Sequence, residues 1–204
     1  MPYLRNLPNA FMKIVALCML SIMLSCNYKG TNKNSVSKVE TRDSLIVDFI
    51  PITYEIMDSI RGDLNGDAFS DVLLLLRNET EIESNENLNR PLLILLGTAT
   101  GYRLGAISQT AVYCFLCGGV MGDPYTGMKI DSSGTFSINH YGGSNWRWTR
   151  NLTFRFDVEA NDWFLLQDVS ESFSVFEEDS VEVDTKTPIE FGRLSFSQFD
   201  IYKE

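Results

Sequence analysis

The stretch Trp146-Arg-Trp-Thr-Arg-Asn-Leu-Thr-Phe-Arg-Phe-Asp-Val158 decides the fold class, because apolar and polar side chains alternate along most of its length. Trp, Leu, Phe and Val take one parity, and Arg, Thr, Asn and Asp take the other, with Arg150 as the only charged residue at an apolar position. A period of two places the sets on opposite faces of one long strand. Residues 159–162 are turn-like and 163–169 are again strand-like. The sequence therefore predicts a long antiparallel hairpin.

Shorter apolar segments extend this β pattern toward the amino terminus. Residues 72–76 and 92–96 are continuous apolar runs, which is typical of strands buried on both faces. The polar residues between them, 78–89, predict a long exposed hairpin loop. Residues 126–130 and 134–140 alternate and predict further strands. Helix is expected only around residues 51–60.

The composition agrees with one β-rich domain. The chain has 204 residues, of which 44% are hydrophobic and 22% charged, and aromatic residues make up 12%. A chain of this length can bury a substantial core, and aromatic side chains favour strands. We expect a mainly β fold: a single compact antiparallel β domain, meander-like or sandwich-like, spanning residues 45–204, with at most one or two short helices.

The amino terminus has the features of an export signal. Arg5 and Lys13 precede an apolar run of 11 residues, 14–24, which is too short for a spanning helix of about 20 residues but suits a signal-peptide core. Met-Leu-Ser-Cys26 then resembles the lipobox of bacterial lipoproteins. This resemblance implies cleavage before Cys26, which would carry diacylglycerol, with further acylation of the new amino end. A cleaved secretory signal without lipid is the alternative.

These features predict the organisation and location of the chain. Residues 1–25 would be the signal peptide, and residues 26–44, rich in Asn, Ser, Thr and Lys, a flexible lipid-anchored linker. The membrane partner would be reached through the lipid, in the bacterial cell envelope, at the outer membrane or facing the periplasm. The formal net charge is −10, and no basic patch stands out. We therefore expect no nucleic-acid partner.

A stretch of chemical interest, Gly62-Asp-Leu-Asn-Gly-Asp-Ala-Phe-Ser-Asp71, enters the strand predicted at 72–76. Calcium takes six to eight oxygen ligands at about 2.4 Å, and alternate side chains of a tight loop can converge on one ion. Candidate ligands are the side chains of Asp63, Asn65, Asp67 and Asp71 and the backbone carbonyl of Phe69. The loop predicts one structural calcium ion, and an acidic surface turn without metal is the alternative.

This loop resembles those of FG-GAP and VCBS repeats, in which Asp-x-Asn-x-Asp-Gly-x-x-Asp leads directly into a strand. The resemblance covers about residues 61–104 and implies a calcium-binding β-hairpin. Ala68 stands where the family has Gly, and a left-handed backbone there would cost about 1 kcal/mol. The chain has one copy of the loop, which excludes a complete propeller built from several blades.

Cys114 and Cys117 are the two cysteines that would remain after signal cleavage beside the anchor Cys26. An oxidising compartment favours a structural disulfide between them, and buried thiols or catalytic redox chemistry are the alternatives. A structural zinc site needs about four ligands, whereas the chain has one histidine, His140. The region from Cys114 to Trp148 is similar to exported bacterial proteins with no established activity.

The segment His140-Tyr-Gly-Gly-Ser-Asn-Trp-Arg-Trp148 offers candidate ligand-binding residues. His140, Tyr141, Trp146 and Trp148 could bind a sugar by stacking and hydrogen bonding. Alternatively, Trp146 and Trp148 fill the core, since they share a parity with Leu152. Ser144 near His140 keeps a small hydrolase open as a further alternative.

The sequence thus predicts a membrane-anchored envelope lipoprotein that is not an enzyme and has a binding or structural role. The alternatives are a carbohydrate-binding module for envelope glycans, an inhibitor or immunity-type protein with a protein partner, and a small periplasmic hydrolase. An exposed aromatic pair would favour a sugar ligand, and a rigid loop with an apolar tip would favour an inhibitor. A cleft holding His140 and a carboxylate would favour the enzyme.

Overall fold

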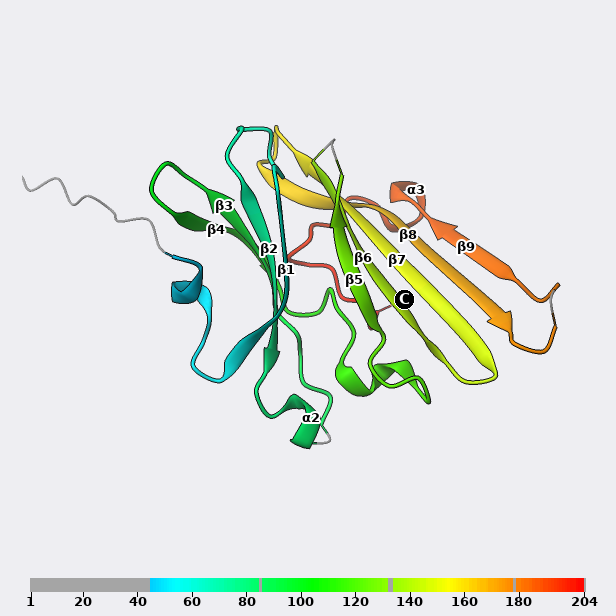
Figure 1. Ribbon diagram of the computed structural model, residues 1–204. Coiled ribbons are helices and arrows are strands. Elements are labelled where there is room, and N and C mark those ends of the chain that lie inside the picture. Colours follow the sequence, from blue (N-terminus) through cyan, green and yellow to red (C-terminus); the bar gives the residue numbers. More distant parts are fainter. Residues whose placement is uncertain (1–44, 85, 132–133, 178, 204) are drawn as a thin grey trace, which may run out of the picture. The chain divides into compact units, whose positions relative to one another are not determined.

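The computed structural model describes residues 45–84, 86–131, 134–177 and 179–203 and confirms the mainly β prediction. Two antiparallel sheets, of four and five strands, make up the fold (Figure 1). The predicted signal peptide, the anchor Cys26 and the linker lie outside the described residues. Within the described part of the chain, no helix has the length and apolar character needed to cross a membrane.

The first sheet is a meander in the order β1-β2-β3-β4. Its strands are β1 (Tyr54–Gly62), β2 (Asp71–Asn78), β3 (Leu92–Gly97) and β4 (Tyr102–Ser108). A 3₁₀ turn, η1 (Ile46–Phe49), precedes β1, and a short helix, α2 (Glu81–Ser84), lies in the β2–β3 connection.

The second sheet is also a meander, in the order β5-β6-β7-β8-β9. Its strands are β5 (Tyr125–Ile130), β6 (Thr135–Gly143), β7 (Trp146–Asp157), β8 (Asp162–Ser174) and β9 (Glu182–Lys186). The 3₁₀ turn η2 (Phe115–Gly118) precedes β5, and the short helix α3 (Pro188–Phe191) follows β9. The predicted long hairpin is β7–β8, although Val158 lies beyond β7 and is exposed.

The prediction of a helix around residues 51–60 is wrong, because most of this segment belongs to strand β1. β1 pairs with β2 from Tyr54 opposite Asn78 to Gly62 opposite Asp71. The register shifts between Ile56 and Asp58, and such a bulge interrupts the alternation by which a strand is recognised. Pairing with the apolar β2 therefore decides the conformation, which local pattern alone did not indicate.

The main core lies between the two sheets. Strands β2 and β3 contribute one face of it and β6, β7 and β8 the other, through buried residues such as Leu73, Ile94, Ile138, Leu152 and Leu165. A second cluster on the opposite face of β2 and β3 packs with η1. The two continuous apolar runs are therefore buried on both faces, as their composition predicts.

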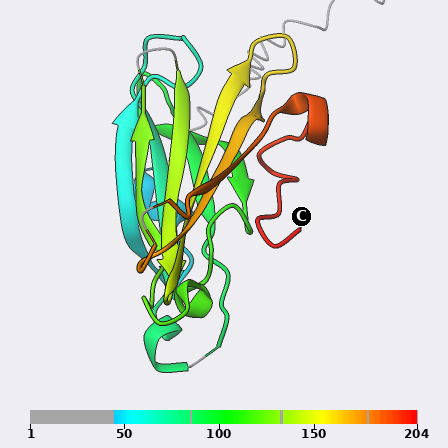
Figure 2. The same cartoon turned by 90° about the vertical axis from the view of Figure 1, so that its right-hand side faces the viewer.

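The two sides of the sandwich are joined differently. On one side β1 lies beside β5, and the Tyr125 hydroxyl donates to the Asp58 carboxylate at 2.6 Å. On the other side the C-terminal segment brings Phe196, Phe199 and Ile201 into the main core. Figure 2 shows this red segment after α3, on the side away from β1. Strand β8 contacts β4 of the first sheet, and the second sheet continues past it as the edge strand β9.

Candidate functional site

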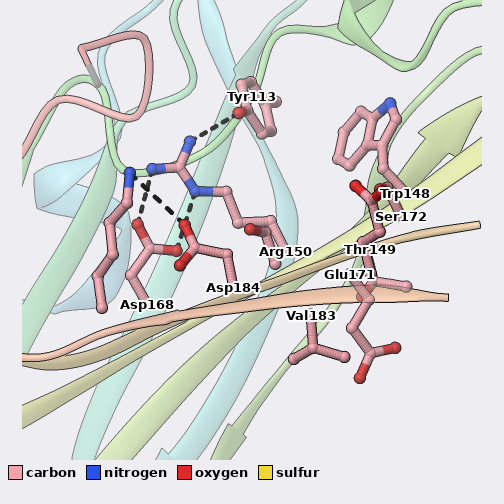
Figure 3. Close-up of a pocket in the computed structure, with 12 residues that line it drawn as sticks. Tyr113, Trp148, Thr149, Arg150, Asp168, Glu171, Ser172, Val183 and Asp184 are labelled. Carbon is pink, nitrogen blue, oxygen red and sulfur yellow. Dashed lines mark hydrogen bonds and ion pairs between the residues drawn. The ribbon is translucent and has the colours of Figure 1, made fainter.

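The core-facing side of β7, β8 and β9 continues past the core and borders a groove of about 560 Å³ (Figure 3). The strand register decides which side chains face it, because directly opposed residues share a face. Trp148 pairs with Ser172, which pairs with Glu182. In the next row Arg150 pairs with Ser170, which pairs with Asp184. The groove face therefore presents aromatic, hydroxyl and charged groups in rows across three strands.

Residues that alternate with these rows along the strands contribute their backbone to the groove, and their side chains lie on the other face of the sheet. Glu171 and Val183 pair with each other in the row between Ser170 and Ser172. In Figure 3 both side chains point to the side of the sheet opposite Trp148.

Trp148 and Tyr113 form the aromatic wall of the groove. Their ring centroids are 5.4 Å apart in an edge-on arrangement. The indole lies over Gly142, where an added Cβ would be 2.5 Å from a ring carbon of Trp148. Glycine is therefore needed at 142 for this position of the tryptophan.

Arg150 fixes the floor of the groove. Its guanidinium makes a two-pronged contact with Asp168, with Nε–Oδ1 at 3.0 Å and Nη2–Oδ2 at 2.8 Å. Nη1 donates to the Tyr113 hydroxyl at 2.8 Å and to the Ile201 carbonyl at 2.9 Å. Burial opposes the charge of Arg150, but the hydrogen bonds that it donates to Asp168 and Tyr113, together with its electrostatic interactions with these two groups, outweigh burial and raise its pKa. Arg150 thus joins β7, β8, the aromatic wall and the C-terminal segment.

The loop that carries Tyr113 is held by the cysteine segment. A disulfide joins Cys114 and Cys117, whose Cα atoms are 5.2 Å apart. The Cys114 N–H donates to the Tyr202 hydroxyl at 2.8 Å. Gly119 forms an isolated bridge with Gly143, so this segment docks on the end of β6. Because Gly118-Gly119 and Gly142-Gly143 lack side chains, the backbones of these two segments can come close together at this bridge.

A buried ion network lies next to this loop. Arg90 is fully buried and contacts two carboxylates, Glu81 at 2.6 and 2.8 Å and Asp123 at 2.6 and 2.7 Å. It also donates to the Tyr113 carbonyl at 3.4 Å. The prediction that 78–89 is wholly exposed is wrong at Glu81, which is buried because it neutralises Arg90.

Of the four candidate ligand-binding residues, only Trp148 lines the groove. Trp146 is 54% exposed, so it does not fill the core as the alternative expected. Tyr141 pairs with Thr149 and belongs to the opposite face. His140 is buried against Tyr113, at 5.1 Å between ring centroids, and burial lowers its pKa to about 4.

In the predicted calcium loop, side-chain oxygens accept hydrogen bonds from backbone N–H groups of the same loop. Asp63 Oδ1 accepts the N–H groups of Asn65 at 3.2 Å and Gly66 at 2.7 Å. Asn65 Oδ1 accepts the Asp67 N–H at 3.0 Å, and Asp67 Oδ1 accepts the Phe69 N–H at 2.9 Å. These contacts leave lone pairs on the carboxylates. In the described ranges no group of three or more His, Cys, Asp or Glu side chains is arranged to hold a metal.

Asp71 has a different place from the other candidate ligands. It is fully buried and accepts the Leu64 N–H at 2.8 Å and the Gly97 N–H at 2.9 Å. Burial raises its pKa, and the charges of Asp67 and Asp63 add to this effect. Asp71 therefore ties the loop to the end of β3 from inside the fold.

Comparison with known proteins gives no match to a family model, a curated protein or a solved structure. The candidate site therefore stands on its geometry.

Sequence reasoning missed Tyr113, Asp168 and the contribution of β9, which the register alone brings beside Trp148. The one available signal was Arg150, a charged residue at an apolar position of the β7 pattern. Its partner Asp168 lies across the hairpin.

Proposed function

We propose that this chain is a lipid-anchored envelope protein whose β domain binds a glycan in the groove of β7, β8 and β9. The observation that carries the proposal is the placement of Trp148 and Tyr113 above rows of hydroxyl and charged side chains. The groove volume of about 560 Å³ lies within the usual range of small-ligand sites, ~300–1,000 Å³.

The chemistry of the groove suits a hydroxylated ligand with flat apolar faces. An aromatic ring gives such a ligand a large contact area with little loss of conformational entropy. Serine hydroxyls can both donate and accept hydrogen bonds, and Ser170 and Ser172 lie in the two rows that cross the groove face. Because Arg150 and Asp168 bind each other, the floor is preorganised before any ligand arrives.

The calcium ion remains part of the proposal as a structural element. Asp63, Asn65 and Asp67 with the Phe69 carbonyl would hold it with hard oxygen donors. Asp71 would then act as an interior tie, since both of its oxygens accept backbone N–H groups.

Calorimetric titration of the full chain with soluble envelope-type oligosaccharides, including the tetramer of N-acetylglucosamine, tests the proposal. The detergent must lack a sugar headgroup. Trp148→Ala should weaken binding about fivefold or more, because stacking on an aromatic ring contributes roughly 1–3 kcal/mol. Trp146→Ala is the matched control, since Trp146 lies on the same strand outside the groove lining. Equal loss in both variants, or no binding by the unchanged chain, would contradict glycan binding in the groove.

A protein partner is the second candidate, and exposed apolar side chains at one end of the domain favour it. Val120 is 84%, Trp146 54% and Phe176 77% exposed. Their loops adjoin, since Gly119 bridges Gly143 and the Val175 N–H donates to the Asn145 carbonyl. Exposed apolar side chains gathered on adjoining loops favour an interaction site. Capture of one envelope protein that depends on Trp146 and Phe176 but not on Trp148 would favour this function.

A further inference from the structure

We propose that the groove selects glycans with free amino groups, and that the Glu182 carboxylate receives the ammonium group of a sugar near the one stacked on Trp148. This inference rests on the proposed glycan binding. The juxtaposition that carries it is the row Trp148, Ser172 and Glu182 across β7, β8 and β9.

The charges on the groove face balance except at Glu182. Arg150 is held by Asp168 at 2.8 Å. Lys186 lies 3.9 Å from Asp184, a longer contact between two solvent-accessible side chains. Glu182 has no ion-pair or side-chain hydrogen-bond partner among the residues that the structure describes. The groove face therefore carries one uncompensated negative charge, at its β9 edge.

The same pairing argues against an acidic glycan as the ligand. A sugar carboxylate or phosphate would need a cation, but Arg150 is held by Asp168 at 2.8 Å and Lys186 lies beside the Asp184 carboxylate. Arg150 also uses Nη1 for the Tyr113 hydroxyl and the Ile201 carbonyl. An anion at Arg150 would displace these contacts and would face the carboxylates of Glu182 and Asp184, whereas an ammonium group would meet a carboxylate without displacing a partner.

The distance along the row suits an oligosaccharide rather than a single sugar. Neighbouring strands are about 4.8 Å apart, so Trp148 and Glu182 lie roughly 10 Å apart across the sheet. Ser172 between them offers a hydroxyl to the intervening part of the ligand. One sugar stacked on the indole would thus place a later unit of the chain at the carboxylate.

Two tetrasaccharides of the same linkage, one of glucosamine and one of N-acetylglucosamine, test this inference by calorimetry with the full chain. At pH 6 and low salt, where the sugar amines carry a proton, the amino form should bind about fivefold more tightly, the upper range for one exposed ion pair. Glu182→Gln should abolish this preference, because the amino form should lose the affinity that it gains from the carboxylate. Glu177→Gln should keep it, because Glu177 is an exposed acidic residue of the β8–β9 connection outside the groove lining.

The outcomes separate this inference from the proposed function. If the acetylated tetramer binds as tightly as the amino form or more tightly, glycan binding stands and the selection for amines is wrong. If both variants lose the preference equally, the acidic surface in general attracts the amine, and the role of Glu182 is wrong. If neither tetramer nor any other glycan binds, the proposed function fails and the inference fails with it.

Discussion

At the scale of single residues, Ala68 shows the cost of a side chain at a left-handed position of the proposed calcium loop. Its φ is +67°, in the left-handed region that favours glycine. Ala68→Gly should therefore raise the free energy of unfolding by about 1 kcal/mol, since relief of the side-chain clash exceeds the entropy that glycine adds to the unfolded chain. Urea denaturation measures this. Asn161, at φ +51°, is the control, because asparagine tolerates this region. A gain at Asn161→Gly alone would contradict the account.

His140 should make stability depend on pH, because burial lowers its pKa to about 4. The unfolded chain binds the proton near pH 6.5, so the stabilisation is complete above that pH and is lost as pH falls from 6.5 toward 4. Between pH 7.5 and 5 the free energy of unfolding should fall by about 2 kcal/mol through this residue. His140→Gln should lack this component.

The same chain offers a direct check of this pKa, because His140 is its only histidine. NMR of the imidazole protons against pH should show no titration above pH 5.5. A midpoint near 6.5 would mean that the ring is solvated and that the packing against Tyr113 is wrong.

At the scale of elements, the strands with clear apolar patterns could be predicted, and those defined by their partners could not. β2, β3 and the β7–β8 hairpin follow from residue type alone. β1 and the edge strand β9 did not, because a bulge breaks the pattern of the first and polar or charged side chains make up most of the second. The groove was missed for the same reason: its residues come together through strand register, which a linear pattern does not contain.

The proposed calcium loop is an element whose effect on β2 can be measured. Added calcium should raise the melting temperature by mass action. At a hundredfold excess over the dissociation constant, the free energy of unfolding should rise by about 2.7 kcal/mol. Magnesium should substitute poorly, because it requires a smaller octahedral site. Asp67→Ala should remove the calcium effect, whereas a change at the exposed Glu83 should not. An unchanged melting curve with chelator and with calcium, and no heat of binding, would show an acidic turn without metal.

At the scale of the whole molecule, the proposed lipid anchor would keep the binding groove at the envelope. The mature protein should begin at Cys26 and partition into the detergent phase, because two or more acyl chains anchor stably where one does not. Cys26→Ala should release the domain or block processing, as followed by membrane fractionation and mass spectrometry of the amino end. A native protein that is fully soluble and begins at another residue would contradict the lipoprotein interpretation.

The central claim, that the groove binds a glycan on Trp148, can be tested most directly through the three tryptophans of the chain. Trp148 lines the groove, Trp146 is exposed outside its lining, and Trp163 is buried in the core. Their indole N–H signals can be followed by NMR during titration with the glucosamine tetramer. We predict that the Trp148 signal shifts in a saturable manner while those of Trp146 and Trp163 stay in place. A shift of Trp146 alone, or no shift of Trp148 with saturating glucosamine tetramer and none with saturating N-acetylglucosamine tetramer, would contradict the claim.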